Sequence, residues 1–279
     1  MSEENRYAVL IDAENVSPKY MKVIFDEISN YGVTTYRRIY GDWTSTRNSG
    51  WKSVLLDNSV TPIQQYSYTE GKNASDSAMI IDAMDILYTM SVDGFCLVSS
   101  DSDFTRLASR LRESGMTVIG MGESKTPNAF IAACNAFKYL DILYASGNEE
   151  EAESEAAEEK RPGVRRNTKR TEANGDSARR MAPKKEPAPQ PQTKLSTIRR
   201  ALRTIIQENS DDNDWISLAN LGNQLAKRFP DFDVRNYGHK KLTTFVESLG
   251  DFEVDRRIMS TDGKVQQVFV HTRERNTKA

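Results

Sequence analysis

The chain has 279 residues, enough for one large or two modest domains, and its charged residues nearly balance to a net charge of −2. Its two cysteines, Cys96 and Cys134, lie in apolar stretches without a CxxC or Cys/His pattern, which argues against a disulfide framework or a structural zinc site. We find no basic segment followed by an apolar leader, and no run near the roughly 18 apolar residues that span a bilayer, so we expect a soluble, cytoplasmic protein without membrane contact.

Residues 1–147 alternate strand and helix patterns, which is typical of parallel βαβ construction. We expect strands over 7–12, 34–42, 61–68, 95–100 and 116–122. We expect helices over 18–32, 49–59, 74–90, 104–114 and 127–141. There is no GxGxxG after the first strand and no GxxxxGK[ST] anywhere, so the usual phosphate cradles of dinucleotide-binding and P-loop proteins are missing. The predicted fold class is α/β with a parallel sheet.

Residues 148–193 lose aromatic and β-branched side chains and are rich in charge and proline. Such a segment cannot bury enough apolar surface to offset its conformational entropy, so we expect a disordered linker. Residues 160–185 hold ten Lys/Arg against two acids. The linker is therefore either a solvated tether or an arm that binds polyanions non-specifically.

Residues 194–273 have a different pattern, with amphipathic helices expected over 194–209, 217–229 and 237–250. Two strand-like segments, FEVDRR and VQQVFVHT, flank the turn signal TDGK and predict a hairpin. Three helices followed by a hairpin are typical of a small winged-helix domain.

Acidic and amide side chains follow the strands of the first unit. Asp12 ends the first strand, with Glu14 and Asn15 beyond it, and Asp101 and Asp103 follow the fourth. Ligands of open parallel sheets bind at the carboxyl ends of the strands, so these groups should share one edge. At about 100° per residue, Asp76 lies on the helix face that should meet the sheet, near the same strand ends.

Each of these carboxylates also has a simpler explanation. Asp76 could be a capping carboxylate three residues after Asn73, and Asp103 could cap the helix that begins at Phe104. Several carboxylates in one crevice are nevertheless costly unless a positive group lies among them. A hard divalent cation, Mg²⁺ or Mn²⁺, suits oxygen ligands and resolves the repulsion.

Three segments, LIDAEN, GKNASDSAMIIDAMDILY and LVSSDSDFTRLASRLRESGMTVIGMG, resemble the NYN domain, in particular its LabA-like branch within the PIN-like nuclease superfamily. The resemblance covers about residues 5–145. It implies a Rossmann-like sheet whose clustered acids hold Mg²⁺ or Mn²⁺ and cut RNA phosphodiesters. The residues that match the family's catalytic, metal-binding acids are Asp12, Asp76, Asp101 and Asp103. Asn15 matches an amide beside the metal.

Several other groups could contact the scissile phosphate. Lys72 precedes the acidic helix and is either a phosphate ligand or a surface lysine. Ser99, Ser100 and Thr126 could donate hydroxyl hydrogen bonds to phosphate or serve the structure alone. Both histidines, His239 and His271, lie in the second unit, so cleavage by a histidine pair is not available to the first.

Two other aspartate-based families fit less well. A haloacid-dehalogenase-type phosphatase needs DxDx[TV], and the segment here is DAENV, with Glu14 in place of the second aspartate. A phosphorylatable receiver domain needs an acidic pair, a phosphoacceptor and a lysine on successive strands, and that order is absent.

The segment DFDVRNYGHKKLTTFVES looks like part of a LOTUS domain, also called OST-HTH. Members of that family are winged-helix modules linked to RNA binding and, in some cases, to protein partners. Residues that could bind single-stranded or irregular RNA through phosphate contacts and stacking are Arg235, Tyr237, His239, Lys240, Lys241, Arg256 and Arg257. The alternative is an ordinary charged surface, since the net charge of the unit is only +3.

The two resemblances imply a metal-dependent endoribonuclease in which a tethered module raises the local concentration of RNA. The alternative is a non-catalytic RNA-binding or regulatory protein that uses the same domains for RNA or protein partners. The number of metal ions, the preferred RNA and the oligomeric state stay open.

Overall fold

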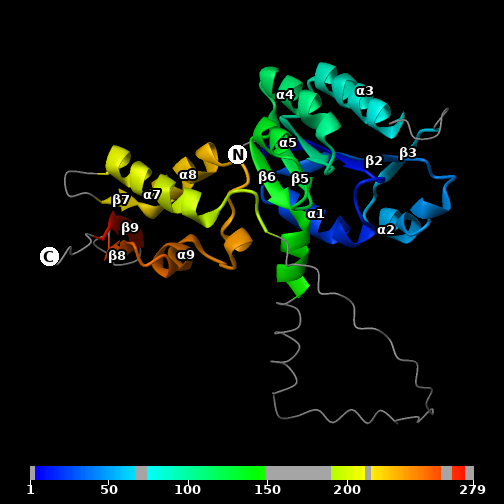
Figure 1. The fold of residues 1–279 in the computed structure, drawn as a ribbon. Coiled ribbons are helices and arrows are strands. Elements are labelled where there is room, and N and C mark those ends of the chain that lie inside the picture. Colours follow the sequence, from blue (N-terminus) through cyan, green and yellow to red (C-terminus); the bar gives the residue numbers. More distant parts are fainter. Residues whose placement is uncertain (1–3, 67–73, 149–189, 211–214, 259–265, 274–279) are drawn as a thin grey trace, which may run out of the picture.

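A computed structural model describes residues 4–66, 74–148, 190–210, 215–258 and 266–273. The first part is a six-stranded parallel sheet in the order β3-β2-β1-β4-β5-β6 (Figure 1). Its strands are β1 (Arg6–Asp12), β2 (Val33–Gly41), β3 (Thr61–Gln64), β4 (Gly94–Val98), β5 (Thr117–Gly122) and β6 (Ala136–Tyr139). This is the strand order of the Rossmann fold, as the predicted fold class requires.

Helices cover both faces of this sheet (Figure 1). Their bounds are α1 (Met21–Ile28), α2 (Trp51–Asp57), α3 (Ala74–Thr89), α4 (Thr105–Glu113) and α5 (Asn128–Ala133). Side chains from α3, α4 and α5 form one buried cluster, and those from α1 and α2 form another on the opposite face. Because both faces are covered, the central strands are continuous apolar runs rather than alternating ones.

The strand β6 was not predicted. The apolar run from 127 to 141 suggested one helix, but α5 ends at Ala133 and residues 140–148 are helical again after the strand. Asn135 makes the break, because its side-chain oxygen accepts a hydrogen bond from the Val118 N–H at 2.8 Å and its own N–H donates to the Val118 carbonyl. The segment is thereby paired with β5 and adds a sixth strand to the expected five.

The second part is a small helical domain with a three-stranded antiparallel sheet in the order β7-β9-β8. Its elements are α7 (Leu195–Asn209), β7 (Ile216–Ser217), α8 (Leu218–Arg228), α9 (Leu242–Ser248), β8 (Phe252–Ile258) and β9 (Gln266–Thr272). The three helices and the hairpin strands agree with the prediction, but β7 was missed because two residues carry no alternation. The third helix is shorter than expected, and the residues before it form a 3-10 turn, Val234–Tyr237.

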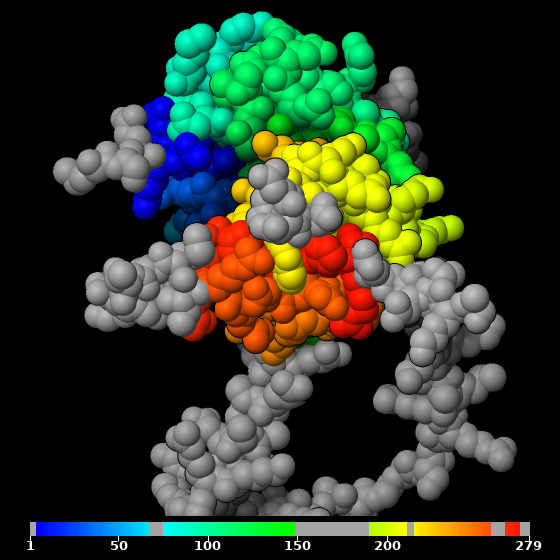
Figure 2. All heavy atoms as spheres, turned by 90° about the vertical axis from the view of Figure 1, so that its left-hand side faces the viewer, coloured from blue at the N-terminus to red at the C-terminus, as the bar shows by residue number. Residues whose placement is uncertain are grey.

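The small domain packs beside β6, the edge strand of the large sheet (Figure 1). Figure 2, seen from the side of the small domain, shows α7 and α8 in yellow against the green surface of the first part. Most of the expected linker, residues 149–189, and the TDGK turn lie outside the described residues. In the parts that the structure describes, no helix is both long and apolar enough to cross a membrane.

Candidate metal centre

The strand order brings the ends of β1 and β4 together at the carboxyl edge of the sheet. These two strands are neighbours although they are far apart in sequence, and the chain continues outward from them in opposite directions. Such a switch point is where open α/β sheets bind ligands. Ile11 pairs with Val98, so the next residues, Asp12 and Ser99, lie side by side at this edge.

Three carboxylates converge beside the switch point. Asp76, Asp101 and Asp103 each offer an oxygen atom, and these atoms all lie within 4.8 Å of one another. We call these three residues the acidic cluster. Asp76 comes from the first turn of α3, and the other two come from the loop after β4. Asp76 is buried, Asp101 is half-buried and Asp103 is exposed, so the cluster opens to solvent on one side.

Backbone hydrogen bonds fix the loop that carries Asp101. One oxygen of this carboxylate accepts the Asp103 N–H at 3.0 Å, so Asp101 is the N-cap of the 3-10 turn Ser102–Phe104. The Asp101 N–H in turn donates to the Ser99 Oγ at 3.1 Å. The capping role suggested for Asp103 therefore belongs to Asp101, which keeps its second oxygen for another partner.

Asp12 lies behind the acidic cluster, fully buried and fully hydrogen-bonded. Its Oδ2 accepts from the Ser99 Oγ at 2.7 Å and from the Asn15 Nδ2 at 2.8 Å, and its Oδ1 accepts from the Glu14 N–H at 3.0 Å. Burial raises the pKa of Asp12, and the hydrogen bonds from Ser99 and Asn15 oppose that rise. Asp12 is not part of the acidic cluster, although its negative charge acts on Asp76.

The electrostatics of the cluster are concentrated on Asp76. Burial, followed by the negative charges of Asp12, Asp101, Glu14 and Asp103, raises the pKa of Asp76 to about 7. A carboxylate in this position is therefore repelled by its neighbours at neutral pH. A divalent cation would remove that repulsion, and the all-oxygen donor set fits Mg²⁺ or Mn²⁺. The acidic cluster could thus bind a metal.

The hydroxyl groups predicted to contact phosphate are used within the protein. Ser99 links Asp12 to the Asp101 loop, as described above. The Ser100 Oγ accepts the Glu123 N–H at 2.9 Å, and the Thr126 Oγ1 donates to the Glu123 carbonyl at 2.6 Å. The Ser100 hydroxyl thus ties the loop after β4 to the loop after β5, and the Thr126 hydroxyl bonds within the latter loop, so the contact of these groups with phosphate stays a prediction. Lys72 lies outside the described residues.

One acid near the cluster was not chosen from the sequence as a site residue. The Glu14 carboxylate accepts a hydrogen bond from the buried Ser75 Oγ at 2.7 Å, which connects the loop after β1 to the start of α3. This contact holds Asp76, the next residue, at the strand ends. Its signal in the sequence was the position of Glu14 two residues after Asp12, which placed it among the acids at the strand ends and argued against a phosphatase, but gave it no role in the site.

The residues expected to bind RNA in the second part are half-buried or exposed. Arg235 pairs with Glu27 of the first part and with Asp233, and the Tyr237 hydroxyl donates to the Thr193 carbonyl at 2.8 Å. The His239 ring lies against Phe245. The remaining cations of the prediction are at or near the surface: Lys240, Lys241, Arg256 and Arg257. Arg257 lies over the rings of Trp215 and Phe269, two aromatic residues not predicted to take part.

Comparisons with protein-family models agree with this architecture. Two family models match, the NYN domain at residues 6–141 and the OST-HTH/LOTUS domain at residues 193–261. Among solved structures, a protein of unknown function from Vibrio parahaemolyticus is similar at 18% sequence identity with a TM-score of 0.44, over 51% of this chain and 97% of that chain. The search of curated proteins found no match. Residues 6–141 therefore form an NYN domain and residues 193–261 an OST-HTH/LOTUS domain.

Proposed function

We propose that the protein is a metal-dependent endoribonuclease whose acidic cluster is the catalytic centre and whose OST-HTH domain holds the RNA. The observation that carries this proposal is the convergence of three carboxylate oxygens within 4.8 Å of one another at the switch point of an NYN domain. NYN domains are regarded as nucleases and OST-HTH domains as RNA-binding domains, which supports both halves of the proposal.

The residues of this site have separate tasks in the proposal. Asp76, Asp101 and Asp103 would hold Mg²⁺ or Mn²⁺, which, when bound, supplies Lewis-acid activation of water and charge neutralisation at the phosphate. Asp12 receives hydrogen bonds from Asn15 and Ser99, and its charge strengthens the negative field at the cluster. Without a cation this field repels RNA phosphates, so binding at the cluster should depend on the metal.

The second domain is docked directly on the first rather than joined to it only through the chain between them. Pro230 accepts a hydrogen bond from the Phe137 N–H of β6, and Arg235 pairs with Glu27 of the NYN domain. The RNA-binding surface therefore has a fixed position relative to the acidic cluster. We therefore expect the second domain to position the RNA at the cluster, rather than only to raise its local concentration as a free tether would.

The direct test is cleavage of a single-stranded RNA by the purified full chain. We expect cleavage with Mn²⁺ or Mg²⁺, none with EDTA, and loss of at least ~100-fold in rate for Asp101→Asn, which removes a metal ligand and its charge. Asp85→Asn is the matched control, because Asp85 is an exposed aspartate of α3 outside the cluster. Equal rates for Asp101→Asn and wild type would assign the activity to a contaminant. Metal-independent RNA binding without cleavage would favour the regulatory alternative.

A further inference from the structure

The small domain covers the open edge of the large sheet. The Phe137 N–H of β6 donates to the Pro230 carbonyl at 2.7 Å, and the Tyr139 hydroxyl donates to Asp231 at 3.0 Å. The exposed backbone groups of an edge strand are a site of unwanted pairing, and here the second domain blocks that edge. Within the small domain, the Thr193 hydroxyl donates to the same Asp231 carboxylate at 2.6 Å.

Four charged side chains lock the two domains together. Lys138 of β6 lies 2.7 Å from an oxygen of Asp233 and 3.1 Å from an oxygen of Glu27. Arg235 binds both oxygens of Glu27 at 2.9 Å. The side chains of Glu27, Asp233 and Lys138 are only 7%, 10% and 13% exposed, so separating the domains would leave buried charges without their partners. The spacing between the facing surfaces is therefore fixed.

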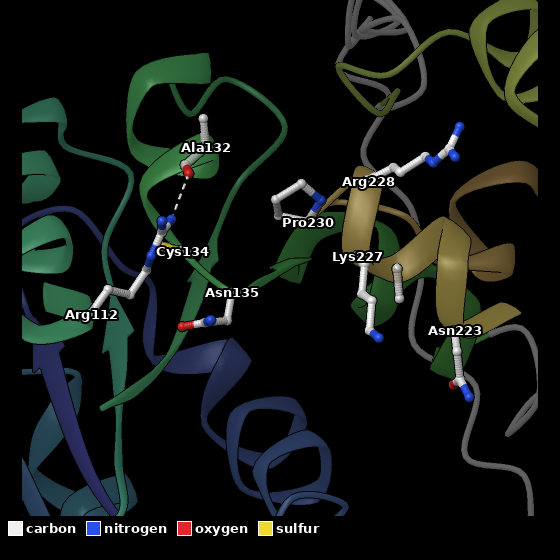
Figure 3. A pocket seen from close by; sticks show the side chains of 9 residues that line it. Arg112, Ala132, Cys134, Asn135, Asn223, Lys227, Arg228 and Pro230 are labelled. Atoms are coloured by element: carbon white, nitrogen blue, oxygen red, sulfur yellow. Dashed lines mark hydrogen bonds between the residues drawn. The ribbon is translucent and has the colours of Figure 1, made fainter. Parts of the chain in front are cut away.

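A cavity of about 750 Å³ opens at this junction (Figure 3). Arg112, from the end of α4, and Asn135, from the turn before β6, line it on the side of the NYN domain. Asn223, Lys227 and Arg228, all from α8, line it on the side of the OST-HTH domain. We call this cavity the junction pocket. Its volume lies within the range of ordinary ligand sites.

The lining of the junction pocket is cationic. Among the residues that the structure describes, it contains three basic side chains, two amides and no carboxylate. The Arg112 Nη1 donates to the carbonyls of Ala132 and Ala133 at 3.0 and 3.1 Å, and within the described parts of the chain its other N–H groups stay available. Arg228 pairs with Glu208. Lys227 is exposed and forms no ion pair with any residue that the structure describes. Amide donors beside cations suit the oxygen atoms of a phosphodiester backbone.

The position of the junction pocket makes it a contact site rather than a second reaction site. It lies beside the start of β6, at the amino edge of the sheet, whereas the acidic cluster lies at the carboxyl edge. Helix α4 connects the two, since Asp103 lies two residues before its first residue and Arg112 is near its end. Nine residues at 1.5 Å rise span roughly 14 Å. A single RNA strand with stacked bases, spaced ~3.4 Å apart along its axis, would cover that distance with about four nucleotides.

We propose that the junction pocket binds the phosphodiester backbone of single-stranded RNA, so that one strand contacts both domains and the acidic cluster. This inference rests on the proposed function, because it takes RNA as the ligand. It adds a binding site that neither domain possesses alone, since each supplies one wall. The RNA contacts then extend beyond the cationic surface expected on the OST-HTH domain.

The test measures equilibrium binding of a fluorescein-labelled, 15-nucleotide single-stranded RNA to the full chain in EDTA, over a range of salt concentrations. Lys227→Glu should weaken binding on the order of fivefold and reduce the slope of log K against log salt by about 0.7, the loss of one phosphate contact. Asn223→Asp, a second exposed position in the pocket, should weaken binding in the same direction. Arg200→Glu on α7 is the control for Lys227→Glu, because it changes the net charge by the same amount at an exposed position outside the pocket.

The outcomes separate the two proposals. If wild type binds and Lys227→Glu binds as tightly as wild type or as Arg200→Glu, the junction pocket is not an RNA site, and the proposed function stands. If wild type does not bind RNA at all, the proposed RNA-holding role of the OST-HTH domain fails and the junction site falls with it. If both pocket variants weaken binding and the control does not, the inference holds. Circular dichroism melts of all variants establish that each is folded.

Discussion

Replacing Asp76 by asparagine should stabilise the metal-free protein, and the gain should grow with pH. The pKa of Asp76 is raised from 3.8 to about 7 by burial and by the surrounding carboxylates. Between these two pH values the folded chain keeps the proton while the unfolded chain has lost it. The folded state then binds more protons than the unfolded state, so the free energy of unfolding falls as pH rises. Asparagine has no proton to lose and escapes this loss.

The size of the effect follows from the same numbers. Each pH unit between 3.8 and about 7 lowers the free energy of unfolding of wild type by ~1.4 kcal/mol. The full loss above pH 7 is therefore ~4 kcal/mol. The cluster opens to solvent at Asp103, and screening through that side reduces the effect. We therefore expect Asp76→Asn to be more stable than wild type by about 1–3 kcal/mol at pH 8, and by clearly less at pH 5.

The assay is guanidinium unfolding of both proteins in EDTA, followed by tryptophan fluorescence between pH 4.5 and 8. Asp85→Asn is the control, an exposed aspartate of the same helix, and should differ from wild type by less than ~0.5 kcal/mol at every pH. Parallel stability curves for wild type and Asp76→Asn would refute the reasoning, because they would mean that Asp76 has no unfavourable charge environment to escape.

Three further predictions concern the metal, the domain junction and the RNA surface. Excess Mn²⁺ should raise the melting temperature of wild type by several degrees and leave Asp76→Asn almost unchanged, which differential scanning calorimetry would measure. Arg235→Ala should open the junction, so hydrogen exchange at the Phe137 N–H should accelerate at least ~10-fold relative to the control Arg200→Ala. Unchanged protection of this N–H would mean that the ion pairs do not hold the two domains together. Lys241→Glu should weaken RNA binding and lower its salt dependence; equal slopes would remove this exposed lysine from the interface.

The junction should also resist moderate acid. Burial alone would raise the pKa values of Glu27 and Asp233, but hydrogen bonds from Arg235 and the charge of Lys138 outweigh it and hold both below their ordinary values. A lowered pKa in the folded state means that the stabilising contribution is complete above the ordinary pKa and is lost only as the pH falls through the lowered value. Small-angle scattering should therefore give the same dimensions at pH 8 and pH 5, and expansion already at pH 5 would contradict this.

The sequence was most informative where a local pattern has a local cause. The end of the apolar run YAVLID marked the end of β1, and helical spacing placed Asp76 at the same edge of the sheet. Asp101 and Asp103 followed from the end of the fourth buried run. These features depend on alternation and on the position of a charge after a strand, so they can be recognised without a structure.

The missing features depend on partners far away in the sequence. β6 is a strand because Asn135 pairs with Val118, while its own composition resembles the end of a helix. Arg235 was interpreted as a surface cation because Glu27, 208 residues earlier, cannot be recognised as its partner from spacing. The direct docking of the two domains could not be predicted either, because its contacts join residues far apart in the sequence. The charge-rich segment before residue 190 suggested independent units instead.

The most direct test of the central claim is a crystal of the full chain soaked in Mn²⁺, with anomalous diffraction used to locate the ion. We predict an ion bound by oxygen atoms of Asp76, Asp101 and Asp103, at the carboxyl ends of β1 and β4, and its absence in Asp101→Asn crystals treated in the same way. An ordered Mn²⁺ elsewhere with none at the acidic cluster, or an ion that persists unchanged in Asp101→Asn, would contradict it.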